Sequence, residues 1–210
     1  MVQSGSRAGN KDFTESERLM NTYDFNESEK RYSNLLNLMK ILLVSVGLFA
    51  LLSGCTQAPK NVQPVQNFEL ERYLGTWYEI ARLDHSFERG LEQVTAVYSM
   101  REDGGVRVMN SGINSETKEP KQAEGKAYFL GSEDVASLKV SFFGPFYGGY
   151  HVAKLDPDYQ MALVIGPNTD YAWILARSKQ PALAECESYY QEAERLGINR
   201  SDWIVGYSCN

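Results

Sequence analysis

The chain has 210 residues, enough for one folded domain with appendages, and 43% of them are hydrophobic and 12% aromatic. Thirteen Tyr, nine Phe and three Trp favour β-strands, whose pleated surface accommodates flat side chains. The net charge of −6, without any cluster of Lys and Arg, argues against nucleic-acid binding, because phosphates attract concentrated positive charge. We therefore expect one mainly β domain that does not bind nucleic acid.

An apolar run near the N-terminus has the features of a secretion signal. Met39 and Lys40 precede the apolar residues 41–52, a run too short for a membrane-spanning helix, which needs about 20 apolar residues. The sequence that ends in Gly54-Cys55 resembles a bacterial lipobox. This resemblance implies cleavage before Cys55 and acylation of its thiol, with palmitate-like chains that anchor the protein to a membrane.

These features divide the N-terminal part of the chain. We expect a signal peptide over residues 39–54 and a lipidated, flexible tether over residues 55–66, where the chain is polar and contains two prolines. Residues 1–38 carry mixed charges without apolar periodicity, so we interpret them as a non-native or disordered extension. Thr56, not Asp, follows the cysteine, which resembles lipoproteins sent to the bacterial outer membrane. The predicted location is that membrane, facing the periplasm.

Residues 67–210 read as short strands separated by turns, the pattern of an all-β sandwich or barrel. Asp103-Gly104-Gly105 is a predicted hairpin turn. Eight consecutive strands favour an antiparallel, up-and-down β-barrel whose interior can hold one small ligand. The predicted strands are residues 77–82, 94–100, 106–110, 125–130, 138–143, 150–155, 160–165 and 171–177.

Two elements follow the predicted barrel. Residues 181–196 form one C-terminal α-helix, with Pro181 in its first turn and Gly197 at its C-cap, and residues 203–207 form a short final strand. Cys186 falls in this helix and Cys209 beyond the last strand. In an oxidising periplasm the two could form a disulfide, but the sequence leaves open whether they are close enough.

Three motifs resemble the lipocalin signatures, in the order found in that family. Gly75-Thr76-Trp77 is similar to the first, Asn168-Thr169-Asp170-Tyr171 to the second, and Arg177 to the third. The run from Phe142 to Tyr150 resembles the bacterial outer-membrane branch of the family. The resemblance implies that Gly75, Trp77, Asp170 and Arg177 are structural, with Arg177 lying across the Trp77 ring at the closed end of the barrel.

Alternation along the strands predicts which side chains point inward. Trp173 and Leu175 share a face with Arg177, and the bulkier face of the second strand carries Tyr98. The resulting lining is apolar and aromatic, which suits an acyl chain. The link over residues 84–92 resembles the loop that partly covers the lipocalin mouth, and both gating and simple solvation remain open for it. The predicted ligand-contacting residues are Tyr98, Val108, Asn110, Ala127, Phe129, Phe142 and Trp173.

The function expected from these features is binding of a fatty acid or lysophospholipid, for lipid storage, transport or membrane maintenance in the cell envelope. We expect no enzyme activity, no cofactor and no metal, because His85 and His151 are the only histidines and no Cys, His and acidic cluster has metal-ligand spacing. Two alternatives remain, a filled structural barrel and a lipid-modifying enzyme that uses Glu79, Tyr98 or Tyr128. The sequence does not decide whether the protein forms a homodimer.

Overall fold

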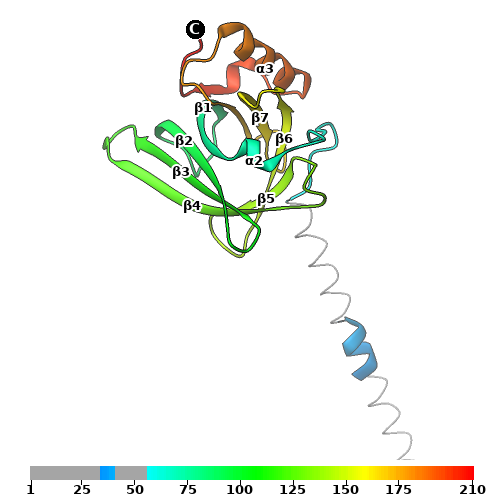
Figure 1. Ribbon diagram of the computed structural model, residues 1–210. Coiled ribbons are helices and arrows are strands. Elements are labelled where there is room, and N and C mark those ends of the chain that lie inside the picture. Colours follow the sequence, from blue (N-terminus) through cyan, green and yellow to red (C-terminus); the bar gives the residue numbers. More distant parts are fainter. Residues whose placement is uncertain (1–33, 41–55) are drawn as a thin grey trace, which may run out of the picture. The chain divides into compact units, whose positions relative to one another are not determined.

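The computed structural model describes residues 34–40 and 56–210 (Figure 1). Residues 34–40 form a helix whose side chains are exposed, and this helix is separate from the unit that contains the barrel. Cys55, and nearly all of the predicted extension and signal peptide, lie outside the described residues. Among the residues that are described, no helix is both long and apolar enough to cross a membrane.

Eight antiparallel strands close into a barrel, as predicted from the sequence. Each strand pairs with the next along the chain, and β1 pairs with both β2 and β8, which closes the sheet on itself. The strands are β1 (Gly75–Leu83), β2 (Leu91–Met100), β3 (Val106–Asn114), β4 (Pro120–Phe129), β5 (Ser137–Ser141), β6 (Gly148–Leu155), β7 (Met161–Ile165) and β8 (Ala172–Ala176).

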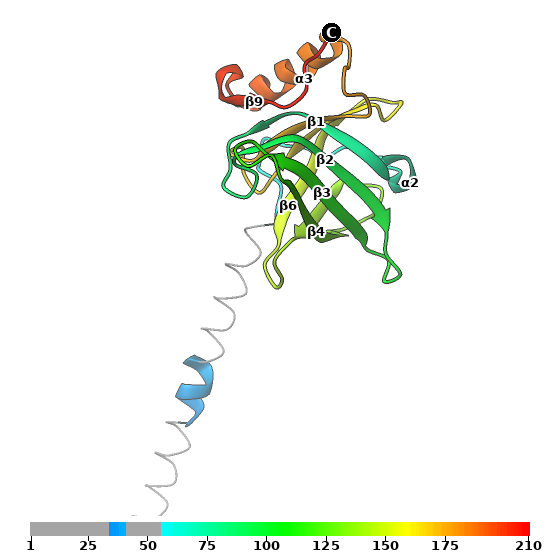
Figure 2. The same cartoon turned by 90° about the vertical axis from the view of Figure 1, so that its left-hand side faces the viewer.

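The remaining elements lie outside the barrel wall or at its end. Figures 1 and 2 show helix α3 (Leu183–Arg195) and strand β9 (Trp203–Val205) on one outer side, where β9 pairs with β1. The short helices α2 (Leu70–Tyr73) and η1 (Arg200–Asp202) precede β1 and β9. Several predicted boundaries were wrong by a few residues. The helix begins at Leu183 rather than at Pro181, the last strand ends at Val205 rather than at residue 207, and β4 begins at Pro120 rather than at residue 125.

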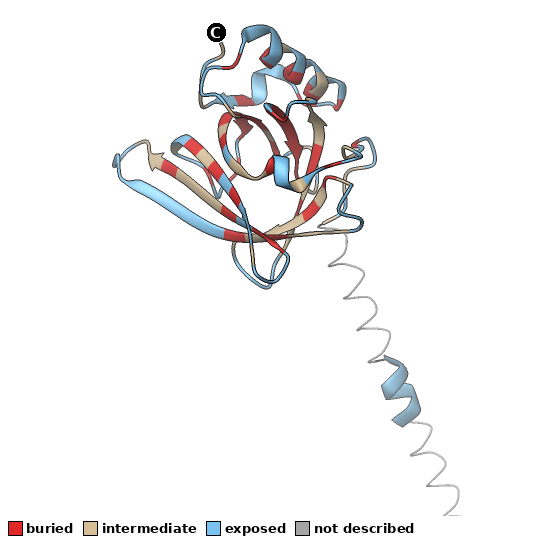
Figure 3. Cartoon of the chain, in the orientation of Figure 1, coloured by how far each residue is buried: buried red, intermediate tan, exposed pale blue. Residues whose placement is uncertain are grey.

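The buried side chains form two hydrophobic clusters, one inside the barrel and one outside its wall (Figure 3). The inner cluster contains Trp77, Tyr98 and Leu175, together with side chains from most other strands. The outer cluster packs α3 against the wall through residues such as Tyr189 and Ile174. Cys186 in α3 is disulfide-bonded to Cys209, so the C-terminal tail is tied to this helix. The helix therefore covers the wall and leaves the interior to the strands.

The segment that we expected to be a flexible tether packs against the barrel instead. Val62 is buried in the outer cluster, and Val65 exchanges backbone hydrogen bonds with Val152 and Ala136. The Asn61 side chain donates a hydrogen bond to the carbonyl of Leu196. The polar composition of residues 56–66 was misleading because a few apolar side chains and backbone pairing suffice to fix a short segment. Within the described part of the chain, every strand and both hydrophobic clusters lie in residues 56–210, so this part contains a complete barrel and its core.

Arg177 seals one end of the barrel, which we call the sealed end. Its guanidinium lies 4.0 Å from the centroid of the Trp77 ring and donates hydrogen bonds to backbone carbonyls of the chain segment that leads into β1. Gly75 has a φ of +94°, and a Cβ there would lie 3.3 Å from Arg177 Nη1, so a side chain would be both strained and crowded. The acceptors are the carbonyls of Arg72, Leu74, Thr76 and, through Nε, Tyr159.

We predict that Arg177→Lys lowers the free energy of unfolding by about 2–3 kcal/mol, because an ammonium cannot serve several carbonyls and a ring face at once. Urea denaturation followed by circular dichroism measures this change. Arg195→Lys on the exposed face of α3 is the matched control and should change stability by less than about 0.5 kcal/mol. Equal stabilities for the two variants would contradict the role given to Arg177.

Candidate functional site

The end of the barrel opposite Arg177 is formed by four connecting loops, and we call it the loop end. Because the strands alternate in direction from Gly75 beside Arg177, the connections at residues 84–90, 115–119, 142–147 and 166–171 all lie there. Residues 84–90, between β1 and β2, fold back over this end, so that their side chains contact the barrel. Asp170, in the last of these loops, donates its backbone N–H to the Asn168 side chain, which suits a turn residue.

The structure gathers the side chains that were predicted to contact a ligand. Six of the seven belong to the inner hydrophobic cluster or pack against it, and Asn110 also points inward, because its amide reaches the carboxylate of Glu88. The six are Tyr98, Val108, Ala127, Phe129, Phe142 and Trp173. They line a common interior, but which molecule they contact is left to the proposal below.

Three tyrosine hydroxyls meet within the inner cluster. Tyr150 Oη lies 2.8 Å from both Tyr73 Oη and Tyr98 Oη, so the three phenols form one hydrogen-bonded chain. Burial, as the largest cause, raises the pKa of Tyr98, and the same holds for Tyr73 and Tyr150. The phenols therefore stay protonated at neutral pH and satisfy one another.

Glu79 was named from the sequence as a candidate for chemistry inside the barrel, but the charged cluster around it toward the loop end was not predicted. Arg82 Nη1 donates a hydrogen bond of 2.6 Å to Glu79 Oε1, and both side chains are almost completely buried. Arg82 Nη2 donates to the carbonyls of Glu88 and Leu91, which ties loop 84–90 to the barrel. The expectation of a lining with few polar atoms was wrong, because two carboxylates and a guanidinium face the interior.

Glu88, from loop 84–90, is the centre of this cluster. Its Oε2 accepts a hydrogen bond of 3.0 Å from Trp173 Nε1, and its Oε1 accepts one of 3.3 Å from Asn110 Nδ2. His85 Nε2 lies 3.2 Å from Glu88 Oε2, yet neither ring nitrogen of this buried histidine forms a well-directed hydrogen bond within the described part of the chain. Arg82 Nε and Asn110 Oδ1 are likewise buried without such a partner among described residues.

The protonation states follow from this crowding. Burial, and after it the neighbouring Glu88 carboxylate, raises the pKa of Glu79 to about 7, although Arg82 opposes the shift. Burial, and after it the Arg82 cation, lowers the pKa of His85 to about 4, so its imidazole is neutral at pH 7. Two buried carboxyl groups thus lie near one guanidinium, which donates hydrogen bonds to the side chain of Glu79 and the backbone carbonyl of Glu88.

Aromatic rings cover the charged cluster. The ring centroids of His85 and Phe87 lie 4.0 Å apart, and Trp173 is 5.1 Å and Tyr171 5.9 Å from His85. Loop 84–90 therefore contacts the barrel instead of extending into solvent, so simple solvation was wrong, and gating by this loop stays a prediction. A polar group bound here would lie between charged side chains and π faces.

A bulge in β1 explains why Arg82 escaped sequence analysis. The register between β1 and β8 shifts between Glu79 and Ala81, so Ala81 packs in the outer cluster and Arg82 returns to the interior. Simple alternation from Trp77 would have placed Ala81 inside. Tyr128, considered for chemistry inside the barrel, instead points outward and donates a hydrogen bond to Asp103 in the exposed hairpin.

Comparison with known proteins identifies the family. A family model described as a lipocalin-like domain matches residues 68–205. The chain belongs to the lipocalin family. It is 56% identical over 172 residues to the outer membrane lipoprotein Blc of Citrobacter freundii, an alignment that covers 79% of this chain and 97% of that protein. It is also 59% identical over 155 residues to the outer membrane lipoprotein Blc of Vibrio cholerae, covering 73% and 91%.

Solved structures agree on the fold. Insecticyanin from the tobacco hornworm Manduca sexta superposes on this lipocalin with a TM-score of 0.57 and 22% identity, over 73% of this chain and 92% of insecticyanin. At that identity the likeness shows the fold alone, a barrel with a C-terminal helix. Lipocalins are a family of binding proteins, and its signature residues Gly75, Trp77 and Arg177 lie together at the sealed end.

The charged cluster predicts a pH dependence of stability. Because the pKa of Glu79 is about 7 against an ordinary value of 4.5, the folded lipocalin binds more protons than the unfolded chain between these values, and stability falls as pH rises through this range. The lowered pKa values of His85 and His151 act in the opposite direction at and below pH values near their ordinary 6.5, and at pH 6.5 they still offset the effect of Glu79. The contribution of Glu79 is therefore read as a difference between variants: between pH 6.5 and 8, the parent should lose roughly 0.8 kcal/mol of unfolding free energy relative to a variant that lacks this carboxyl.

Urea denaturation at pH 6.5 and pH 8 tests this expectation. Glu79→Gln should gain roughly 0.8 kcal/mol on the parent between the two pH values, because no carboxyl titrates at that position, whereas Glu133→Gln on the exposed β4–β5 loop should change like the parent. The same slope in the Glu79→Gln variant would mean that another group titrates in this range.

Proposed function

We propose that this lipocalin binds a single-chain lipid, a fatty acid or a lysophospholipid, and serves lipid storage, transport or membrane maintenance in the cell envelope. The observation that carries the proposal is the unequal distribution of polar and apolar side chains inside the barrel. Apolar and aromatic side chains line the barrel from Trp77 at the sealed end onward, while the charged groups gather toward the loop end around Glu88. An acyl chain with one polar head has the same division of apolar and polar parts.

The acyl chain would bind through burial of apolar surface. Each buried methylene contributes about 0.8 kcal/mol, and side chains such as Val108, Phe129 and Trp173 offer apolar contacts along the interior. The hydroxyls of the tyrosine trio are occupied by one another, so they do not oppose an apolar chain nearby. The seven residues predicted from the sequence are the proposed chain contacts.

The head would bind at the charged cluster. Arg82 Nε and the two ring nitrogens of His85 are buried and form no well-directed hydrogen bond among described residues, and such groups normally bind water or a ligand. A phosphate or carboxylate suits Arg82, and an ammonium suits Glu79 and Glu88 beneath the aromatic rings. Because both signs are present, a zwitterionic lysophospholipid head complements the cluster better than a fatty-acid carboxylate does.

The proposed location is the bacterial outer membrane, through lipid on Cys55, facing the periplasm. The support comes from the sequence around Cys55 and from relatives that are named outer membrane lipoproteins in Citrobacter freundii and Vibrio cholerae. The Cys186–Cys209 disulfide fits an oxidising compartment. We propose a binding protein rather than an enzyme, and no metal cluster of three or more His, Cys, Asp or Glu occurs among residues 34–40 and 56–210.

We predict that Trp173→Phe weakens binding of oleoyl-lysophosphatidylethanolamine about tenfold, because the buried Glu88 carboxylate loses its indole donor and its fixed position. Isothermal titration calorimetry measures the affinity. Trp203→Phe is the matched control, since Trp203 lies in the outer cluster under α3 and should bind the lipid like the parent protein. Unchanged affinity in Trp173→Phe would mean that the lipid head group does not bind at the charged cluster.

The same samples separate binding from the two alternatives. Recovery of intact lysophospholipid after incubation supports binding, whereas appearance of a cleaved or transferred product would support a lipid-modifying enzyme. Absence of any heat of binding, together with absence of co-purified lipid in native mass spectra, would support a filled structural barrel.

We predict that protein from bacterial membranes begins at Cys55 and carries acyl chains, which intact-protein mass spectrometry reads directly. Cys55→Ser removes the thiol that accepts the lipid, so this variant should lack acyl mass and keep the preceding residues. Cys186→Ser is the control and should retain the lipid. An unmodified Cys55, or an N-terminus at another residue, would overturn the anchor.

A further inference from the structure

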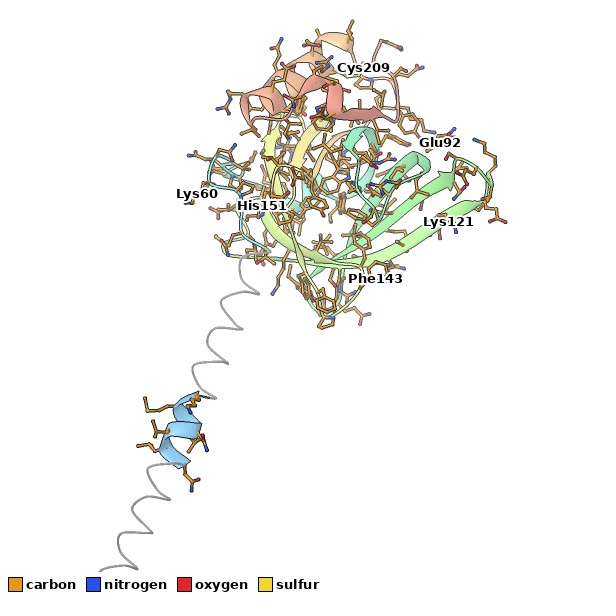
Figure 4. The ribbon with its side chains drawn as sticks, turned by 180° about the vertical axis from the view of Figure 1, so that it is seen from behind. Lys60, Glu92, Lys121, Phe143, His151 and Cys209 are labelled. Carbon is orange, nitrogen blue, oxygen red and sulfur yellow. A yellow bond between two sulfur atoms is a disulfide. The ribbon has the colours of Figure 1, made fainter. Side chains whose placement is uncertain are left out.

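The loop between β5 and β6 carries the two most exposed large hydrophobic side chains of the described residues. Phe143 is 76% and Phe146 73% exposed, and Figure 4 places Phe143 at the edge of the domain opposite Cys209. Phe146 N–H donates a hydrogen bond to the carbonyl of Phe143, so the two rings stand at the two corners of one tight turn. Single exposed hydrophobic side chains are common, but two exposed aromatic rings that are held together at a loop tip are typical of a surface that binds another molecule or a membrane.

The loop is fixed from both sides of the barrel wall. Phe142 packs against the inner cluster, and its ring lies so close to Gly125 that a Cβ there would be 2.8 Å away. On the outer side, the Tyr147 ring lies 6.4 Å from that of Tyr128 and 5.0 Å from Lys139 Nζ. The contacts of Phe142 and Tyr147 therefore hold the two ends of the loop in place, and Phe143 and Phe146 between them are left exposed.

Positive charge accompanies the loop. Lys139 is stacked on Tyr147, and Lys126 and Arg101 border the same surface pocket of about 190 Å³ as Phe142 and Gly144. Lys126 and Lys139 form no ion pair with any residue in the described ranges, while Arg101 is paired with Asp103 and Glu124 with Arg107. Exposed aromatic rings with neighbouring lysines are the composition of surfaces that enter the interface of an anionic bilayer.

The chain enters the barrel domain beside this loop. The carbonyl of Thr56 would lie 3.0 Å from a Cβ at Gly149, two residues after the loop ends at Tyr147. Cys55 immediately precedes Thr56, and consecutive Cα atoms are about 3.8 Å apart. The lipid that we propose for Cys55 would thus begin on the same side as Phe143 and Phe146, which favours a bilayer over other partners for this surface.

We propose that residues 142–147, with Lys126 and Lys139, dock on the lipid bilayer that holds the anchor. Docking would turn the edge of the domain that lies opposite Cys209 toward the membrane surface. This orientation rests on the proposed anchor, but docking itself does not require acylation and can be tested without it.

The test uses residues 56–210, which hold every strand and both hydrophobic clusters, and vesicles of phosphatidylethanolamine with phosphatidylglycerol. Co-sedimentation should show that Phe143→Ser with Phe146→Ser lowers vesicle partitioning about tenfold or more. Leu183→Ser with Val205→Ser is the matched control, because these side chains are 61% and 59% exposed on the α3 side, and it should bind like the parent. Vesicles of phosphatidylcholine alone should bind the parent several-fold more weakly.

A second readout reports contact with the bilayer directly. A tryptophan introduced by Phe143→Trp should be quenched by brominated lipid, and one introduced by Leu183→Trp should not. Equal vesicle binding by the double serine variant and the parent, or absence of quenching at position 143, overturns the proposal. If the serine substitutions abolish self-association in sedimentation velocity while vesicle binding is unchanged, the surface joins two copies of the chain and the proposal is also wrong.

Failure of docking is distinguishable from failure of the proposed function. Binding of oleoyl-lysophosphatidylethanolamine in the absence of vesicles should be the same in the double serine variant and the parent, since neither ring faces the interior. Loss of vesicle binding with intact lipid affinity supports docking alone, whereas absent lipid affinity with intact docking refutes only the ligand.

Discussion

The architecture depends on the contact between Arg177 and Trp77. One guanidinium covers the indole and holds the carbonyls of the segment that enters β1, so the last barrel strand is fixed to the first at one end. Sealing this end leaves the loop end as the place where side chains can vary without opening the barrel. The charged cluster and the exposed aromatic loop both lie toward that end, away from the contact that closes the barrel.

Stability and function meet in the buried Glu79, Arg82 and Glu88 side chains. Removing charges from water is costly, and the cluster is only partly satisfied by Trp173 and Asn110. The pKa of Glu79 is raised because burial disfavours its charged form. A bound zwitterionic head would supply the missing partners, so we expect occupied and unoccupied barrels to differ most in this cluster.

Sequence reasoning succeeded where one local rule acts alone. Alternation along uninterrupted strands put Tyr98, Val108 and Trp173 on the inner face, where they are found. It failed at Arg82, because a one-residue bulge reverses the faces of the rest of β1, and no local signal marks that bulge. It also treated His85 and the polar segment before residue 67 as candidates for solvation, since burial by distant parts of the chain leaves no trace in composition.

The sequence by itself determined the barrel, its strand order and the signature residues, because turn spacing, strand periodicity and three separated motifs each act over short stretches. Only the tertiary structure decided what the interior offers a ligand. Trp173 lies 85 residues from Glu88 in the chain, and the two meet because β1 and β8 pair and loop 84–90 folds back toward Glu79. The contact of Thr56 with Gly149, just after the exposed loop that contains Phe143, is likewise a result of tertiary packing, and no sequence pattern predicts it.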